Sequence, residues 1–244
     1  MNISAHNSAS ELNQTPELLT SLGIEQKSFT FQETLLPYCE KQICPEAPGA
    51  PLLLFFLHGH GSVGHDNFLQ IRIPARPLIE HLRKLGRKTI LIMPQCERNF
   101  QWVDVPWSST SHTLPGQPSK YMSAALALFD AACAAYAPDQ TAGIGISMGG
   151  YGIWDMACRR HFDILGVMCG GADTASAPQF VNTRICIYHG ALDNIVPVCR
   201  GRDMAAALKS AGCREFTYRE LPENAHNVWD EFFTDDFALH YLLG

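Results

Sequence analysis

Gly145-Ile146-Ser147-Met148-Gly149 is the stretch that decides the fold of this 244-residue chain. Residues 141–146 are short and apolar and follow Pro138, so they predict a buried strand. Residues 150–160 have apolar side chains at helical spacing and a basic end, which predicts a helix. Strand, tight turn and helix together form a nucleophile elbow, in which the serine backbone is strained and small neighbours let strand and helix approach. The pattern predicts Ser147 as a nucleophile; the alternative is a glycine-rich turn with an incidental serine.

A serine of this kind requires an acid and then a histidine later in the chain, each on a loop after a strand. Residues 184–189 predict a strand, and Asp193 lies in the turn that leaves it. Residues 215–221 predict another strand, and His226 lies in the following loop. We expect Ser147 to attack a carbonyl, His226 to accept its proton and Asp193 to hold the imidazole. The alternatives are a turn aspartate and a surface histidine.

An oxyanion hole is the next element that this chemistry needs. Residues 51–57 are the most apolar run and predict a central strand that is buried on both faces. Residues 58–62, His-Gly-His-Gly-Ser, follow this strand, and their glycines let backbone amides point at a ligand. The predicted donors are the amides of His60 and Met148.

Histidines near the end of this strand also resemble a metal-binding cluster. His58, His60 and His65 lie close together in sequence, but no H-E-x-x-H motif occurs, and neither an acid nor a cysteine completes the set at a recognised spacing. We therefore expect neither a metal nor an organic cofactor. His58 is expected to pack under the loop with hydrogen bonds to the backbone.

The chain resembles small α/β-hydrolases of the group of predicted peptidases and prolyl-oligopeptidase-like esterases, which is related to feruloyl and acetylxylan esterases and to dienelactone hydrolases. The matching stretches are LLLFFLHGHGSVGHDN (52–67), MPQCERNFQW (93–102), GIGISMGGYGIWDMA (143–157), MCGGAD (168–173), IYHGALDNIVPV (187–198) and NAHNVWDEFF (224–233). The resemblance implies an α/β-hydrolase fold with a Ser147–Asp193–His226 triad that acts on esters. His60 stands where the group often has a small residue, which would narrow the acyl side of the site.

Strands that alternate with helices predict an α/β protein with a mostly parallel central sheet, helices on both faces and no large cap domain. We expect an N-terminal extension over residues 1–27, with a short helix at 16–22, and a single catalytic domain over 28–244. Further strands are expected at 29–35 (an edge strand), 89–93 and 164–169, and helices at 79–85, 119–136, 200–211 and 229–243.

The composition of the chain excludes several classes of protein. Hydrophobic residues make up 46% and charged residues 17% of the chain, which argues against disorder. A net charge of −6 argues against nucleic acid or an anionic membrane surface as partner. No apolar run approaches the roughly 20 residues of a membrane span. The first fourteen residues lack the features of a secretory signal, which predicts a cytoplasmic protein.

Cysteine usage favours a reducing compartment. The nine cysteines are odd in number and include no C-x-x-C pair. A bridge between Cys39 and Cys44 stays open as an alternative.

Residues 95–117 form a loop that is long for a connection between a strand and a helix, and loops of this length are usually functional or disordered. Our hypothesis is that Trp102 and Trp107 form part of an apolar wall for the alcohol or acyl group. The alternative is an aromatic plug that packs the loop onto the body. Gln95 is expected to orient the loop or the substrate.

The chemistry predicted from these features is acyl transfer to water through a serine acyl-enzyme, without a cofactor. We expect a carboxylesterase acting on a short-chain or small aromatic ester, with a small molecule as its partner. A thioesterase or serine peptidase on the same triad, and a non-catalytic binding protein with this fold, are the alternatives. The oligomeric state is left open.

Overall fold

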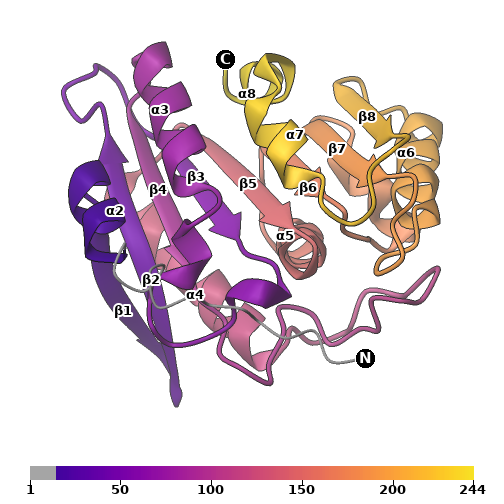
Figure 1. The fold of residues 1–244 in the computed structure, drawn as a ribbon, viewed down its shortest axis with the longest axis horizontal. Helices are drawn as coiled ribbons and strands as arrows, with labels where there is room; N and C mark the ends of the chain where they lie inside the picture. Colours follow the sequence, from indigo (N-terminus) through magenta and orange to yellow (C-terminus); the bar gives the residue numbers. More distant parts are fainter. Residues whose placement is uncertain (1–14) are drawn as a thin grey trace.

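The computed structural model describes residues 15–244 and contains an eight-stranded sheet in the order β1-β2-β4-β3-β5-β6-β7-β8 (Figure 1). The strands are β1 Glu25–Phe31, β2 Thr34–Ile43, β3 Leu52–Leu57, β4 Thr89–Pro94, β5 Gln140–Ile146, β6 Ile164–Met168, β7 Arg184–Gly190 and β8 Phe216–Leu221. The pairs β1–β2 and β2–β4 are antiparallel, and every other pair is parallel. The predicted α/β architecture with a mostly parallel sheet is confirmed.

Helices cover both faces of the sheet, as predicted (Figure 1). They are α2 Thr15–Leu22, α3 Ala75–Leu85, α4 Lys120–Tyr136, α5 Met148–Arg159, α6 Cys199–Ala211, α7 Trp229–Thr234 and α8 Asp236–Leu243. Short 3-10 turns lie at His60–Ser62, Leu69–Ile71 and Thr174–Phe180. One core layer packs against α4, α5 and α6, and the other packs against α3 and α8.

The central strand β3 shows how one apolar run serves both layers. All six of its residues are buried. Leu53, Phe55 and Leu57 point into the layer of α4 and α5, whereas their alternate neighbours point into the layer of α3 and α8. Side chains alternate between the two faces of a strand, so a strand covered on both faces requires an uninterrupted apolar sequence.

Three predicted elements are wrong in extent. The helix predicted at residues 79–85 begins four residues earlier, at Ala75. Residues 29–35 are not one edge strand: β1 ends at Phe31, the chain turns at residues 32–33 with Gln32 at φ 51°, and β2 continues antiparallel. The predicted closing helix 229–243 is two helices, because the chain is extended at Asp235. The Asp235 carboxylate accepts a hydrogen bond from the Phe237 amide and so begins α8.

The sheet topology brings the predicted site together. The parallel strands β3, β5, β7 and β8 end at the same edge of the sheet. Ser147 follows β5, Asp193 follows β7 and His226 follows β8. Residues 95–117, which contain no helix or strand, follow β4 at this edge.

The structure also bears on the cysteines and on a possible membrane span. All nine cysteines are free, so Cys39 and Cys44 are not bridged. Within residues 15–244, no helix combines the length and the apolar character needed to cross a membrane. The first fourteen residues of the predicted extension lie outside the described part of the chain.

Candidate active site

Ser147 lies in the sharp turn between β5 and α5. Its backbone has φ 53° and ψ −115°, a conformation that costs free energy for a residue with a side chain. Gly145 and Gly149 make this turn possible: a Cβ atom at Gly145 would lie 2.2 Å from the Gly149 oxygen, and one at Gly149 would lie 1.9 Å from the Leu57 oxygen. The strand and helix therefore approach each other more closely than any other residue type would permit.

Ser147, His226 and Asp193 form a continuous hydrogen-bonded chain. His226 Nε2 lies 2.8 Å from Ser147 Oγ, and His226 Nδ1 lies 2.8 Å from Asp193 Oδ2. An ionised carboxylate can only accept, so Nδ1 carries the proton and Nε2 is free to accept from the serine hydroxyl. Ser147 is buried, with 8% of its surface exposed.

The Asp193 carboxylate is fully buried and held on both oxygens. Oδ1 accepts hydrogen bonds of 2.9 Å from the amides of Ile195 and Val196. Burial alone would raise the pKa of Asp193, but the hydrogen bonds from His189, His226 and these two amides outweigh it and hold the pKa well below its usual range. The carboxylate is therefore ionised at neutral pH.

His189 is a functional candidate that the sequence interpretation missed. Its Nε2 lies 3.0 Å from the Val196 oxygen and 3.3 Å from Asp193 Oδ2, so the Nε2–H is shared between the two acceptors. The side chain is fully buried, and its Nδ1 has no hydrogen-bond partner. Gly201 provides the room, because a Cβ atom there would lie 2.9 Å from this Nδ1. The signal in the sequence is a histidine four residues before the acid, at the end of the predicted strand 184–189.

The loops that carry Asp193 and His226 are packed directly on each other. The Leu192 amide donates to the Asn224 oxygen at 3.0 Å. A Cβ atom at Gly190 would lie 1.9 Å from the Ala225 oxygen. The Trp229 ring meets the His226 ring edge-on, with centroids 6.1 Å apart. These contacts fix the distance between acid and base.

The loop after β3 lies beside the serine. A Cβ atom at Gly59 would lie 3.5 Å from Ser147 Cβ. His58 packs beneath this loop as expected: its Nδ1 donates to the Gly59 oxygen at 2.7 Å, and its Nε2 accepts from the Cys96 amide at 2.9 Å. Burial lowers the pKa of His58 to about 4, so the ring is neutral at pH 7.

His60 and Met148 occupy positions that suit the predicted oxyanion donors. Met148 is the first residue of α5, where a helix leaves amides without intrahelical acceptors. His60 is exposed and begins the 3-10 turn next to Gly59. Its role and that of Met148 as amide donors stay predictions.

The predicted substrate-binding residues lie in three different environments. Trp102 is fully buried, and its Nε1 donates to the His58 oxygen at 3.1 Å. Gln95 is also fully buried; it accepts from the Asn67 amide at 2.7 Å and donates to the Ser62 oxygen at 3.1 Å. Trp107 is partly exposed, with its ring 5.1 Å from that of His60.

These environments correct part of the prediction. A side chain without exposed surface cannot form the wall of a pocket, so Trp102 is the aromatic plug of the alternative hypothesis. Gln95 orients the loops around it and does not face a substrate. The role of Trp107 in an apolar wall stays a prediction.

Among residues 15–244, few of the potential metal ligands lie close enough together to share an ion. Within the described part of the chain, one group of potential ligand atoms lies within 4.8 Å, and it consists of Cys169, Asp193 and His226. Burial raises the pKa of the Cys169 thiol well above its usual value, which keeps it protonated and a poor ligand. Both ring nitrogens of His58 are occupied by backbone groups. The Asp193–His226 contact is better explained as a hydrogen bond than as half of a metal site.

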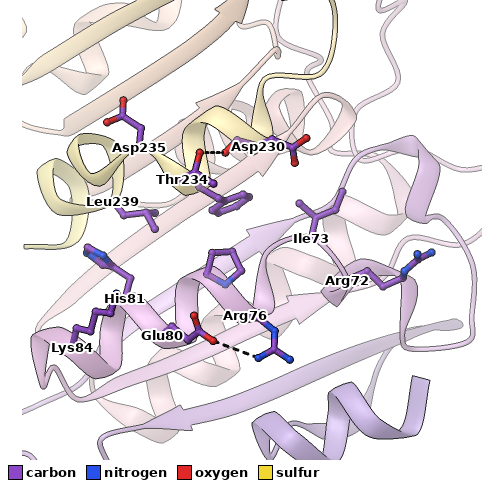
Figure 2. A pocket seen from close by; sticks show the side chains of 12 residues that line it. Arg72, Ile73, Arg76, Glu80, His81, Lys84, Asp230, Thr234, Asp235 and Leu239 are labelled. Carbon is purple, nitrogen blue, oxygen red and sulfur yellow. Dashed lines mark hydrogen bonds and ion pairs between the residues drawn. The ribbon is translucent and has the colours of Figure 1, made fainter. Parts of the chain in front are cut away.

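A separate pocket of about 520 Å³ lies between α3 and the helices α7 and α8 (Figure 2). Charged side chains from both sides line it, including Arg76 and Glu80 of α3, which form an ion pair of 3.4 Å, and Asp230 of α7. None of the residues of the serine, acid or histidine loops named above lines this pocket.

The sheet topology and the serine elbow define the class of α/β-hydrolases. A model of the phospholipase/carboxylesterase family matches residues 38–238, so the chain belongs to this family. The expected relation to a family of ester hydrolases is confirmed at the level of the family. No curated protein matches the chain in a sequence comparison.

Solved structures with a similar fold include several esterases. A thermostable esterase has a TM-score of 0.78 at 24% identity; the match covers 89% of this chain and 62% of that esterase, so this chain spans less than two thirds of its length. A ferulic acid esterase has a TM-score of 0.59 at 14% identity, covering 89% of this chain and 95% of the other. A lidless serine hydrolase from Xanthomonas campestris has a TM-score of 0.57 at 12% identity, covering 91% and 96%. These likenesses confirm the predicted α/β-hydrolase fold.

Proposed function

We propose that the chain is a serine carboxylesterase that hydrolyses small esters through an acyl-enzyme, with Ser147, His226 and Asp193 as its catalytic triad. The observation that carries the proposal is the unbroken chain of two 2.8 Å contacts from Ser147 Oγ through His226 to Asp193. Family membership supports the ester bond as the target.

In the first half of the reaction, Ser147 Oγ bonds to the carbonyl carbon of the ester while its proton moves to His226 Nε2. Asp193 stabilises the imidazolium through the Nδ1–H, without accepting the proton. The tetrahedral intermediate then collapses, the bond to the alcohol oxygen breaks, and His226 returns the proton to the leaving alcohol. The acyl group is left on Ser147.

In the second half, a water molecule attacks the acyl-enzyme and gives its proton to His226. The bond to Ser147 breaks, the serine regains a proton, and the carboxylic acid leaves. The amides of Met148 and His60 would donate to the oxyanion in both steps, at the first turn of α5 and on the loop after β3.

The proposed substrate is a short-chain or small aromatic ester. The loop of Asp193 presents Leu192 and Ile195 with 62% and 44% exposure, which gives an apolar rim beside the site. Trp107 and His60 lie together near the oxyanion loop and would limit the length of the acyl group. No large cap domain is present in residues 15–244 to enclose a long chain.

The test is hydrolysis of p-nitrophenyl acetate, butyrate and octanoate by wild type, Ser147→Ala and the control Ser210→Ala, which removes an exposed hydroxyl from α6. We expect the acetate and butyrate to be cleaved fastest, Ser147→Ala to lose at least roughly 10³-fold in kcat, and Ser210→Ala to match wild type. Methyl ferulate and an acyl-CoA run beside them measure aromatic and thioester preference. Equal activity of Ser147→Ala and wild type would refute the serine mechanism.

A further inference from the structure

A buried arginine lies beside the active site without a carboxylate partner. Arg200, on the first turn of α6, is 4% exposed. Its Nη2 donates to the Ala172 oxygen at 3.2 Å and to His112 Nδ1, while its Nε has no hydrogen-bond partner. Its guanidinium carbon lies 5.5 Å from the centre of the Tyr151 ring. All of these contacts are with neutral groups.

Arg200 lacks the carboxylate partner that other arginines of the chain have. The described ion pairs join carboxylates to Arg76, Arg159, Arg160, Arg184, Arg202 and Arg219, and none of them includes Arg200. Removing a guanidinium from water is strongly unfavourable unless an opposite charge lies beside it. His112 does not supply this opposite charge, because it accepts a hydrogen bond from Arg200 as a neutral ring. Burial and the nearby Arg200 lower the pKa of His112 to about 4.

Arg200 lines a pocket of about 270 Å³ between the 95–117 loop, the segment after β6 and α6. The hydroxyl groups of Thr110, Ser111 and Thr174 belong to residues that line the same pocket. Hydroxyls and guanidinium N–H groups are the donors that bind oxyanions. The volume is below the range of pockets for drug-sized ligands and suits a small one.

We propose that this pocket binds a small oxyanion, a carboxylate or phosphate group, with Arg200 as its cationic anchor and the hydroxyls of Thr110, Ser111 and Thr174 as further donors. Asp203, an exposed residue of α6, also lines the pocket. Its negative charge weakens the binding of an anion and so sets a modest affinity.

Tyr151 connects this pocket to the catalytic serine. Its amide donates to the Ser147 oxygen at 3.1 Å, one helical turn away, and its hydroxyl donates to the Trp107 oxygen at 3.1 Å. Trp107 in turn packs on His60. The anion has two possible sources: an acidic group on the ester itself, which rests on the proposed function, or a free anion.

The first experiment measures the binding of inorganic phosphate to the full chain by calorimetry at constant ionic strength. We expect saturable binding to wild type, at least a 10-fold loss of affinity in Arg200→Gln, and a 3- to 10-fold gain in Asp203→Asn. Glu46→Gln, which makes the same charge change at an exposed position between β2 and β3, should match wild type. Wild-type affinity in Arg200→Gln overturns the proposal. If Arg200→Gln does not fold, unchanged affinity in Asp203→Asn overturns it.

The second experiment identifies the source of the anion by comparing the acidic ester p-nitrophenyl hemisuccinate with the neutral p-nitrophenyl valerate. If the substrate supplies the anion, Arg200→Gln loses at least 10-fold in kcat/KM on the acidic ester and stays within 2-fold of wild type on the neutral one. An unchanged ratio of the two esters, with phosphate binding that depends on Arg200, identifies a free anion. A chain that binds phosphate through Arg200 but cleaves no ester contradicts the proposed function alone.

Discussion

At the scale of single residues, the orientation of Asp193 fixes the orientation of His226, the base of the proposed triad. The carboxylate is held by two amides on one oxygen and by two histidines on the other. Two of these partners, Ile195 and Val196, belong to its own turn, whereas His189 approaches from the end of β7. A buried carboxylate with this many donors has one orientation, and that orientation presents Oδ2 to His226.

We expect His189→Phe to lower kcat about 10-fold while KM stays within 2-fold, because a hydrogen bond to a charged group that matters in the transition state is lost. His189→Gln keeps an N–H donor and should recover most of this activity. The measurement is steady-state kinetics on p-nitrophenyl butyrate, with melting temperatures to confirm folding. A folded His189→Phe enzyme with wild-type kcat would show that His189 only fills space.

Trp102 should behave as a core residue. Trp102→Ala removes a fully buried ring and its hydrogen bond to His58, so we expect a loss of about 3–5 kcal/mol in the free energy of unfolding. Trp107→Ala is the matched variant on the same loop, and we expect an activity change that depends on the substrate, with little change in stability. Denaturant titration and kinetics on esters of increasing length measure both. A stable Trp102→Ala variant with altered chain-length preference would restore the wall hypothesis.

At the scale of elements, the close approach of β3, β5 and α5 creates the serine elbow. Gly145 and Gly149 face backbone atoms and not flexible side chains, so no rotamer change can make room for a larger residue. The elbow is therefore a property of three elements together.

Gly149→Ala should disrupt the elbow, since its methyl group would lie 1.9 Å from the Leu57 oxygen. We expect loss of activity and a large drop in melting temperature. Gly116→Ala is the control, because a Cβ atom there meets no atom within 4 Å. Circular dichroism melts and esterase assays compare the two. An active, stable Gly149→Ala variant would mean that α5 can move away from β3 at little cost.

The elements that are best predicted from the sequence are those with a strong hydrophobic periodicity and with residues that clearly begin and end a helix or strand. Residues 119–136 predicted α4 within one residue, because Ser119 accepts from the Met122 amide and Ala137 with Pro138 ends the helix. The β1–β2 hairpin was missed because alternation continues through its two-residue turn. The break at Asp235 was missed because apolar residues occur at helical spacing on both sides of it.

Within the candidate site, the order of serine, acid and histidine and the strand before each are visible in the sequence. The burial of Trp102 and Gln95 is not, because it depends on how residues 95–117 fold over α5 and the loop after β3. His189 was missed although it lies only four residues before Asp193, because it is also the last residue of the predicted apolar strand 184–189. Arg200 was missed because its pocket forms only where the 95–117 loop and the segment after β6 meet α6.

At the scale of the whole molecule, stability should depend on pH through His58. Its folded pKa is about 4 and the usual value for histidine is 6.5, so the unfolded chain binds more protons between these values. The stabilisation is complete above pH 6.5 and is lost as the pH falls towards 4.

We expect this group to remove roughly 2 kcal/mol from the free energy of unfolding between pH 7 and pH 5. In His58→Gln, whose amide can still donate to Gly59 and accept from Cys96, the loss over this interval should be smaller by about that amount. Denaturant titrations of both proteins at the two pH values measure it. Equal losses in the two proteins would show that His58 is not buried as a neutral ring.

The strand β8 lies at the edge of the sheet, and none of its residues is fully buried. The free energy of local unfolding is smallest where few apolar contacts must break, so β8 and the loop after it open before the elbow between β5 and α5 does. His226 lies on that loop. Mild denaturation would therefore inactivate the enzyme reversibly while the central strands remain protected from hydrogen exchange.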